Sequence, residues 1–186
     1  MVTLSIAAIL MVIAVPSFET YRRNAELTAA TNTLLSAMNA ARGEAMKRGM
    51  SAMVVPAVVA NNQFNLNNWN SGWVVFIDND GSQDFTAADT LVSSQAPLPV
   101  YMNIVGNNDA GLSVKPYIMF DASGYSKRRS GGFGALALTL RRTDLDVAGV
   151  PPSDQVRQLI ISSTGRARTC RPSSVSDATC AATLTQ

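Results

Sequence analysis

An uncharged stretch at the start of the chain constrains its fold more than any other feature. Residues 1–15 are almost all apolar, and the first charged side chain is Glu19. The stretch is slightly shorter than the ~20 apolar residues of a typical membrane-spanning helix. It lacks the basic start and the small-residue cleavage site of a secretory signal peptide. A helix buried in a soluble core is the alternative, but apolar residues on every helical face favour a membrane segment.

The helical pattern continues beyond Pro16 and indicates a second, amphipathic half. Apolar residues recur at spacings of seven, four, three and four, which places them on one helical face: Leu27, Leu34, Met38, Ala41 and Ala45. Lys47 and Arg48 suit the C-terminal end of a helix, and Gly49 is a typical stop. The sequence therefore predicts one helix from residue 1 to the end of this pattern, about 70 Å long. Pro16 lacks an N–H group and should kink or locally melt it.

Beyond residue 49 the pattern changes from helical to strand-like. Apolar and β-branched runs occur between turn residues at seven places: 52–59, 72–77, 90–93, 100–105, 117–120, 135–140 and 159–163. These observations predict an α+β fold, in which the amphipathic half of a long N-terminal helix packs on an antiparallel β-domain of six or seven strands. The expected division is a helix over residues 1–49 and a β-domain over residues 50–186.

The composition argues against an enzyme. The chain has no histidine, which removes the commonest general base and a common metal ligand. It also has no Gly-x-Ser-x-Gly motif and no paired carboxylates in a pattern typical of a cleft. We therefore expect no catalytic residues, no cofactor and no small-molecule substrate. A membrane-tethered β-domain enzyme is a poorly supported alternative.

Two further features suggest a ligand but have simpler interpretations. Four carboxylates fall within residues 78–89 and could hold Ca²⁺: Asp78, Asp80, Asp84 and Asp89. The glycine falls at the fourth position of this loop instead of the sixth position of an EF-hand, and no glutamate closes the loop. We therefore expect a polar turn and no metal site. Trp69 and Trp73 could form a stacking platform, but a place in the core is the more usual role.

Two cysteines, Cys170 and Cys180, lie near the C-terminus. They form neither a CxxC motif nor a Cys/His cluster, which argues against zinc. A disulfide that closes a short loop is expected if the domain lies outside the cytoplasm, and two free thiols if it lies inside. Because the N-terminal segment argues for export, the sequence favours the disulfide.

Basic residues gather towards the C-terminus. Residues 1–121 carry six basic and nine acidic side chains, whereas residues 122–186 carry nine basic and four acidic ones. Arg166 and Arg168 are two positions apart, so they point to the same side of an extended segment. Gly165 before them permits a sharp turn and a close approach to a ligand. Two such arginines could contact adjacent phosphates, and a solvated surface or a subunit contact is the alternative.

Several stretches resemble the GspH/FimT family of type IV minor pilins and pseudopilins, in a FimT-like or FimU-like form. The resemblance lies in the N-terminal helix with Pro16 and in residues 41–49, 72–81, 120–124 and 165–168. The N-terminal motif of the family, Gly-Phe-Thr-Leu-Ile-Glu-Leu, is absent. We therefore expect this sequence to lack the prepilin leader and the first few mature residues.

The resemblance implies a filament subunit that is stored in a membrane. Residues 1–18 would span the bacterial inner membrane once, with the β-domain in the periplasm, and would later enter the core of a pilus or pseudopilus. The residues expected in this segment are Leu4, Ile6, Ile9, Leu10, Val12, Ile13, Pro16 and Phe18. The implied partners are membrane lipid before assembly and then other major and minor pilins, bound through the N-terminal helix.

The resemblance also implies a ligand. Gly165, Arg166 and Arg168 match the DNA-contacting motif of FimT-type minor pilins, which implies binding of double-stranded DNA for natural transformation. Charge adds four further candidates for DNA contact: Lys127, Arg128, Arg129 and Arg171. The predicted function is a minor pilin that takes part in filament assembly and in DNA uptake. The alternatives are a GspH-like minor pseudopilin of a type II secretion system and an assembly-initiating minor pilin that does not bind DNA.

Overall fold

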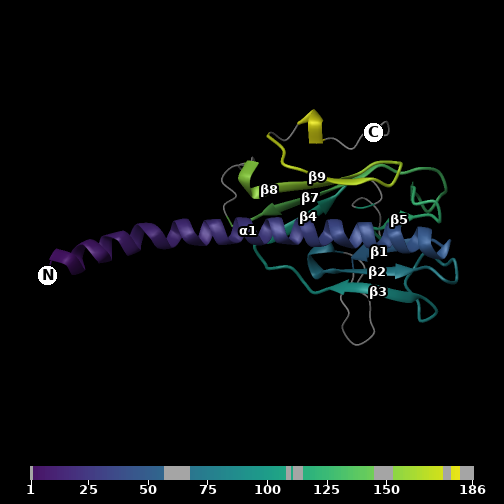
Figure 1. Cartoon of the computed structure of the whole chain (residues 1–186), viewed down its shortest axis with the longest axis horizontal. Coiled ribbons are helices and arrows are strands. Elements are labelled where there is room, and N and C mark those ends of the chain that lie inside the picture. Colours follow the sequence, from purple (N-terminus) through teal and green to yellow (C-terminus); the bar gives the residue numbers. More distant parts are fainter. Residues whose placement is uncertain are drawn as a thin grey trace.

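Figure 1 shows a computed structural model of the chain, in which residues 2–56, 68–107, 110, 115–144, 153–173 and 177–180 are described. For residues 2–16, 153 and 178 the description covers the backbone alone. The first element is the long helix α1 (Val2–Arg48), as the sequence predicts. It passes through Pro16 without interruption, so the expected local melting is wrong and the kink at Pro16 stays a prediction. A proline removes one intrahelical hydrogen bond, and the many turns on either side keep the helix together.

Nine strands among the described residues form two antiparallel sheets beside α1. The first sheet has the order β3-β2-β1-β5-β6 and consists of β1 (Ala52–Pro56), β2 (Trp73–Ile77), β3 (Thr90–Gln95), β5 (Ile118–Phe120) and β6 (Ser126–Lys127). The second sheet has the order β4-β7-β8-β9 and consists of β4 (Met102–Gly106), β7 (Leu136–Arg142), β8 (Val156–Ile161) and β9 (Ala167–Cys170). The short 3₁₀ helices include η1 (Trp69–Ser71), η3 (Ser153–Gln155) and η4 (Ala178–Cys180). The predicted α+β fold is confirmed.

Seven of these strands overlap the seven runs that the sequence predicts, and two do not. The sequences of β6 and β9, Ser-Lys and Ala-Arg-Thr-Cys, lack the apolar alternation of a half-buried strand. Each forms because it pairs with a strand that is already well buried: β6 with β5 and β9 with β8. Residues 57–59 of the first predicted run lie outside the described residues.

The core lies between the C-terminal half of α1 and the faces of both sheets that meet it. The five residues of the predicted apolar helix face are all 0% exposed: Leu27, Leu34, Met38, Ala41 and Ala45. Leu138 and Leu159 pack in the same cluster from the second sheet. Trp69 and Trp73 belong to it as well, so their predicted place in the core is confirmed. The Trp69 indole N–H donates to the Ala110 carbonyl at 2.7 Å, which satisfies its polar atom.

The N-terminal half of α1 projects away from both sheets (Figure 1). Where it leaves them, Arg142 at the end of β7 donates to the Thr20 carbonyl at 3.1 Å. Within the residues that the structure describes, no helix has an apolar stretch long enough to cross a membrane. The side chains of the predicted membrane residues from Leu4 to Pro16 lie outside that description. Phe18 is described, and its side chain is exposed.

Candidate functional site

The turn between β8 and β9 carries the predicted Gly-Arg-x-Arg motif. The Gly165 N–H donates to the Ser162 carbonyl at 2.9 Å, and the Ser162 N–H donates to the Arg166 carbonyl at 3.0 Å. Gly165 has a φ of +79°, and a Cβ atom there would lie 1.9 Å from the Gly124 carbonyl oxygen. Both facts require glycine at this position. The backbone that Gly165 approaches so closely belongs to this chain itself.

Arg42 of α1 fixes this turn against the turn between β5 and β6. Its Nε donates to the Gly124 carbonyl at 3.0 Å, and its Nη2 donates to the Thr164 carbonyl at 3.2 Å. The Ser126 N–H donates to the Ser163 carbonyl at 3.2 Å, which ties β6 to the same place. Sequence reasoning missed Arg42, because its partners lie 82 and 122 residues away along the chain. We call this meeting of α1, β6 and residues 162–165 the three-segment junction.

Arg166 and Arg168 follow the junction at the start of β9. Arg166 is exposed, and among the described residues its guanidinium has no hydrogen-bond or ion-pair partner. Arg168 is half-buried and donates to the Thr179 carbonyl at 3.1 Å. It pairs with Ile160 of β8, whose side chain belongs to a small apolar cluster separate from the main core. The two arginines therefore differ: the Arg166 guanidinium has no partner among the described residues, whereas the Arg168 guanidinium binds the Thr179 carbonyl.

The C-terminal segment is attached to β9 by a disulfide between Cys170 and Cys180, as the sequence favours. The two Cα atoms are 5.6 Å apart. This bond holds η4 beside β9, where Thr179 receives the hydrogen bond from Arg168. Arg171, next to the disulfide, forms an ion pair with Asp154.

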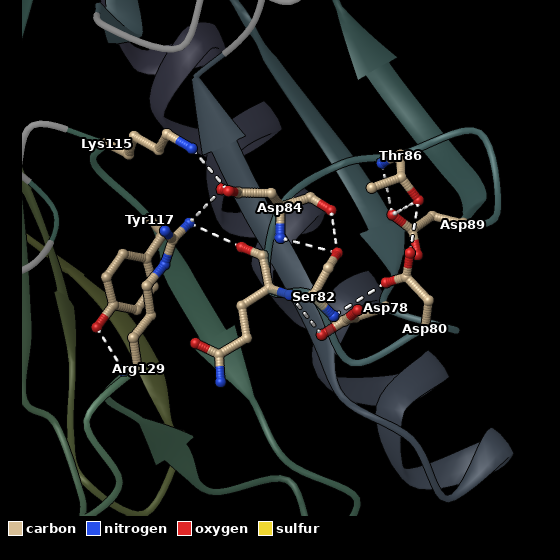
Figure 2. Close-up of polar contacts among 10 residues, drawn as sticks. Asp78, Asp80, Ser82, Asp84, Thr86, Asp89, Lys115, Tyr117 and Arg129 are labelled. Atoms are coloured by element: carbon tan, nitrogen blue, oxygen red, sulfur yellow. Dashed lines mark hydrogen bonds and ion pairs between the residues drawn. The ribbon is translucent and has the colours of Figure 1, made fainter.

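The basic residues of 127–129 are held to different degrees by neighbours in the same chain. Lys127 forms an ion pair with Asp121 at 3.6 Å and lies 3.9 Å from the centre of the Phe133 ring. Arg129 forms an ion pair with Asp84 at 3.1 Å. Arg128 between them is exposed. The structure brings Lys127 close to the three-segment junction through β6, whereas the side chain of Arg129 reaches towards the loop after β2 (Figure 2).

A second candidate surface lies on α1 where it leaves the sheets. Phe18 and Tyr21 are three positions apart on the helix, and their side chains are 69% and 72% exposed. Residues at this spacing are neighbours on a helix surface. Sequence reasoning found Phe18 but missed Tyr21, because Tyr21 follows the first charged residue. Beside them, Arg23 forms ion pairs with Glu19 and with Asp144, which keeps charge close to this apolar pair.

Comparison with known proteins agrees with this architecture. A family model described as type II transport protein GspH matches residues 30–165 of the chain. Two crystal structures of the type IV minor pilin FimU from Pseudomonas aeruginosa strain PAO1 share the fold, with TM-scores of 0.55 and 0.54. Both are 14% identical in sequence, and the matches cover 84% and 81% of this chain and 98% of FimU. A comparison with curated protein sequences finds no match.

Proposed function

This chain belongs to the GspH family, and on that premise we propose that it is a minor pilin, a non-catalytic subunit of a type IV pilus. One observation carries the proposal: α1 continues far beyond the sheets on which its C-terminal half packs (Figure 1). Phe18 and Tyr21 stand exposed on the part that leaves the sheets. Large apolar side chains at neighbouring helical positions are typical of a contact surface, and here the matching surface is the helix of another subunit.

The same proposal includes the subcellular location and membrane topology of the subunit. Residues 1–18 hold the subunit in the bacterial inner membrane with a single pass, and the β-domain lies in the periplasm. The support is the uncharged sequence of this segment. During assembly the helix leaves the lipid and packs against the helices of other major and minor pilins. Because lipid tails and helix surfaces are similarly apolar, close packing between helices decides this exchange.

A double substitution, Phe18→Asp with Tyr21→Asp, tests this proposal. The full chain is produced in cells that assemble type IV pili, and the sheared filament fraction is probed with an antibody. We expect at least a tenfold loss from filaments, because two unpaired charges buried between helices cost more than the ~1.4 kcal/mol that a tenfold change requires. The β-domain should keep its wild-type melting temperature, because both side chains are exposed.

The matched control keeps the apolar character of both positions. Phe18→Leu with Tyr21→Phe should enter filaments at close to the wild-type level. Recovery of the aspartate variant in filaments at the same level as this control would contradict the proposed helix contact.

A minor pseudopilin of a type II secretion system is the second candidate, because the matching family model is described as a type II transport protein. Producing the full chain in strains that retain only one of the two machineries separates the candidates. Incorporation into pili without the secretion system supports the minor pilin, and incorporation into pseudopili alone supports the pseudopilin.

We propose further that the pilin binds double-stranded DNA for uptake, with Arg166 and Arg168 as the main contacts. Support comes from the exposure of Arg166, which has no partner among the described residues, and from its place beside the three-segment junction. Because the turn is already fixed in the free protein, binding of a phosphate to the guanidinium orders little additional backbone, which lowers the entropic cost of binding. Arg128 is exposed and adds positive charge, whereas Lys127, Arg129 and Arg171 add less because each forms an ion pair with an aspartate of the chain.

The DNA proposal predicts that Arg166→Ala with Arg168→Ala weakens binding of the full chain, in detergent micelles, to duplex DNA at least tenfold. The salt dependence of binding should also become shallower by about two units of the log–log slope, because two fewer counterions are released. Gel retardation at several salt concentrations measures both effects.

The control for this experiment removes the same charge elsewhere. Arg22→Ala with Lys47→Ala alters two exposed side chains on α1. It should leave DNA binding within about twofold of wild type if position matters more than net charge. Equal losses in the two double variants would show that the Gly-Arg-x-Arg turn is not the site.

A further inference from the structure

The loop between β2 and β3 brings three carboxylates together. Asp78 directly follows β2, Asp89 directly precedes β3, and Asp80 lies between them. One oxygen atom from each carboxylate lies within 4.8 Å of the others. Figure 2 shows the three carboxyl groups next to one another along one side of the loop. Residues eleven positions apart in the sequence therefore share one small site.

One oxygen of this cluster is buried and has no partner. Asp78 is 5% exposed, and its Oδ2 accepts a hydrogen bond from the Gln83 N–H at 3.1 Å. Its Oδ1 is buried and has no hydrogen-bond partner among the described residues. A buried carboxylate oxygen without a donor is costly, and native proteins rarely leave one unsatisfied. This oxygen indicates a ligand that none of the described residues supplies.

Among the described residues, the donors that bind the other two carboxylates are all neutral. Asp80 accepts from the Ser82 N–H at 2.9 Å and from the Thr86 hydroxyl at 3.0 Å. Asp89 accepts from the Asn79 N–H at 2.9 Å and from the Thr86 N–H at 2.7 Å. These bonds fix the two carboxylates in position and stabilise their ionised forms, but they add no positive charge to the cluster.

Two cations beside this loop bind a different carboxylate. Lys115 and Arg129 both bind Asp84, at 2.7 Å and 3.1 Å, and Figure 2 shows them on the side of the loop away from Asp89. Among the described residues, neither Asp78, Asp80 nor Asp89 forms an ion pair. The carboxylates of Asp78, Asp80 and Asp89 thus lie together, whereas Lys115 and Arg129 bind the carboxylate of Asp84.

We propose that Asp78, Asp80 and Asp89 bind Ca²⁺. Calcium takes oxygen ligands at about 2.3–2.6 Å, so oxygens on opposite sides of the ion lie about 5 Å apart, close to the spacing of this cluster. Mg²⁺ needs ligands at about 2.1 Å and suits a tighter arrangement. The loop is not an EF-hand, because the spacing of its glycine and acidic residues differs, but other loop geometries also bind calcium. The ion joins the two ends of the β2–β3 connection and fixes the loop between them.

Calorimetric titration of the full chain with CaCl₂ tests the proposal, after treatment with EGTA and in detergent micelles. We expect one site with a Kd on the order of 0.1–1 mM, the range of extracellular calcium modules. MgCl₂ should bind at least about tenfold more weakly. The melting temperature should rise by several degrees in 5 mM CaCl₂ (about fivefold or more above the expected Kd) because the ion binds the folded chain. Absence of both heat and a melting shift with CaCl₂ would overturn the proposal.

Two variants of the same loop locate the site. Asp80→Asn removes one negative ligand and should weaken calcium binding at least about tenfold. Asp84→Asn removes an equal charge four residues away but keeps the cluster, so it should bind calcium with nearly the wild-type Kd. Asp84→Asn is expected to lower the melting temperature, since Lys115 and Arg129 lose their shared partner. Loss of binding in Asp84→Asn with retention in Asp80→Asn would overturn the assignment.

Discussion

Gly165 is the single residue on which the shape of the three-segment junction depends most. Its φ of +79° is unfavourable for any side chain, and the Gly124 carbonyl oxygen occupies the place of a Cβ atom at 1.9 Å. Relief of that clash would require the β5–β6 turn and Arg42 to move together, because Arg42 binds both turns. The same local event would also move Arg166, the next residue.

We predict that Gly165→Ala lowers the free energy of unfolding by at least about 2 kcal/mol more than Gly131→Ala does. Gly131 also has a positive φ, +84°, but a Cβ atom there meets nothing within 4 Å. It therefore reports the backbone strain alone, about 1 kcal/mol. Urea unfolding of the full chain in detergent micelles, followed by tryptophan fluorescence, measures both values. Equal losses would mean that the junction yields to the extra methyl group without cost.

At the scale of elements, α1 has two halves with different surroundings. Its C-terminal half buries one apolar stripe, from Leu27 to Ala45, against both sheets. Its N-terminal half projects from them, and the exposed side chains of Phe18 and Tyr21 mark the transition. The first half of the sequence pattern is apolar all round and the second half is amphipathic, so the same division is visible in the sequence.

The elements that could be predicted from sequence are those whose own residues carry the signal. The helix and seven strands have either helical periodicity or apolar, β-branched runs. The strands β6 and β9 depend on pairing with β5 and β8, so their short polar sequences contain little evidence of them. Pro16 shows a partial error in the other direction: a local rule predicted a kink or local melting, and the 47-residue helix shows no melting.

The candidate sites could likewise be predicted from sequence only in part. Charge made Arg129 a further candidate for DNA contact, but the structure pairs it with Asp84, which lies 45 residues away. Likewise, the spacing of the acidic residues argued against an EF-hand, whereas the unpartnered oxygen of Asp78 exists only in the folded loop. Contacts between distant segments decide which charges remain available, and a single sequence does not contain them.

At the scale of the whole molecule, a hydrogen-bonded cluster of Arg23, Arg142 and Asp144 connects the projecting helix to the β-domain; we call this cluster the joint. The Arg142 side chain is 1% exposed and donates to the Thr20 carbonyl at 3.1 Å and to Asp144 Oδ2 at 2.6 Å. Arg23 of α1 donates to the same oxygen at 2.6 Å. The hydrogen bonds from Arg142, followed by those from Arg23, lower the pKa of Asp144 to about 2 from its usual 3.8. Asp144 thus links strand β7 to the helix through two arginines.

This joint predicts a specific loss of stability in acid. The pKa of Asp144 is lower in the folded chain than in the unfolded chain. Its ionised form therefore adds to the free energy of unfolding above pH 4, and this stabilisation is lost as the pH falls towards 2. Asp144→Asn lacks this contribution and leaves Arg142 buried without a counter-charge, so at pH 7 it should unfold with about 3 kcal/mol less free energy than wild type. The difference between the two should stay constant from pH 7 to 5 and shrink by about 1–2 kcal/mol by pH 2. Urea unfolding of both full chains in detergent micelles at each pH measures the difference, in which the titration of other carboxylates cancels. A difference that stays constant down to pH 2 would show that Asp144 does not hold the joint through its charge.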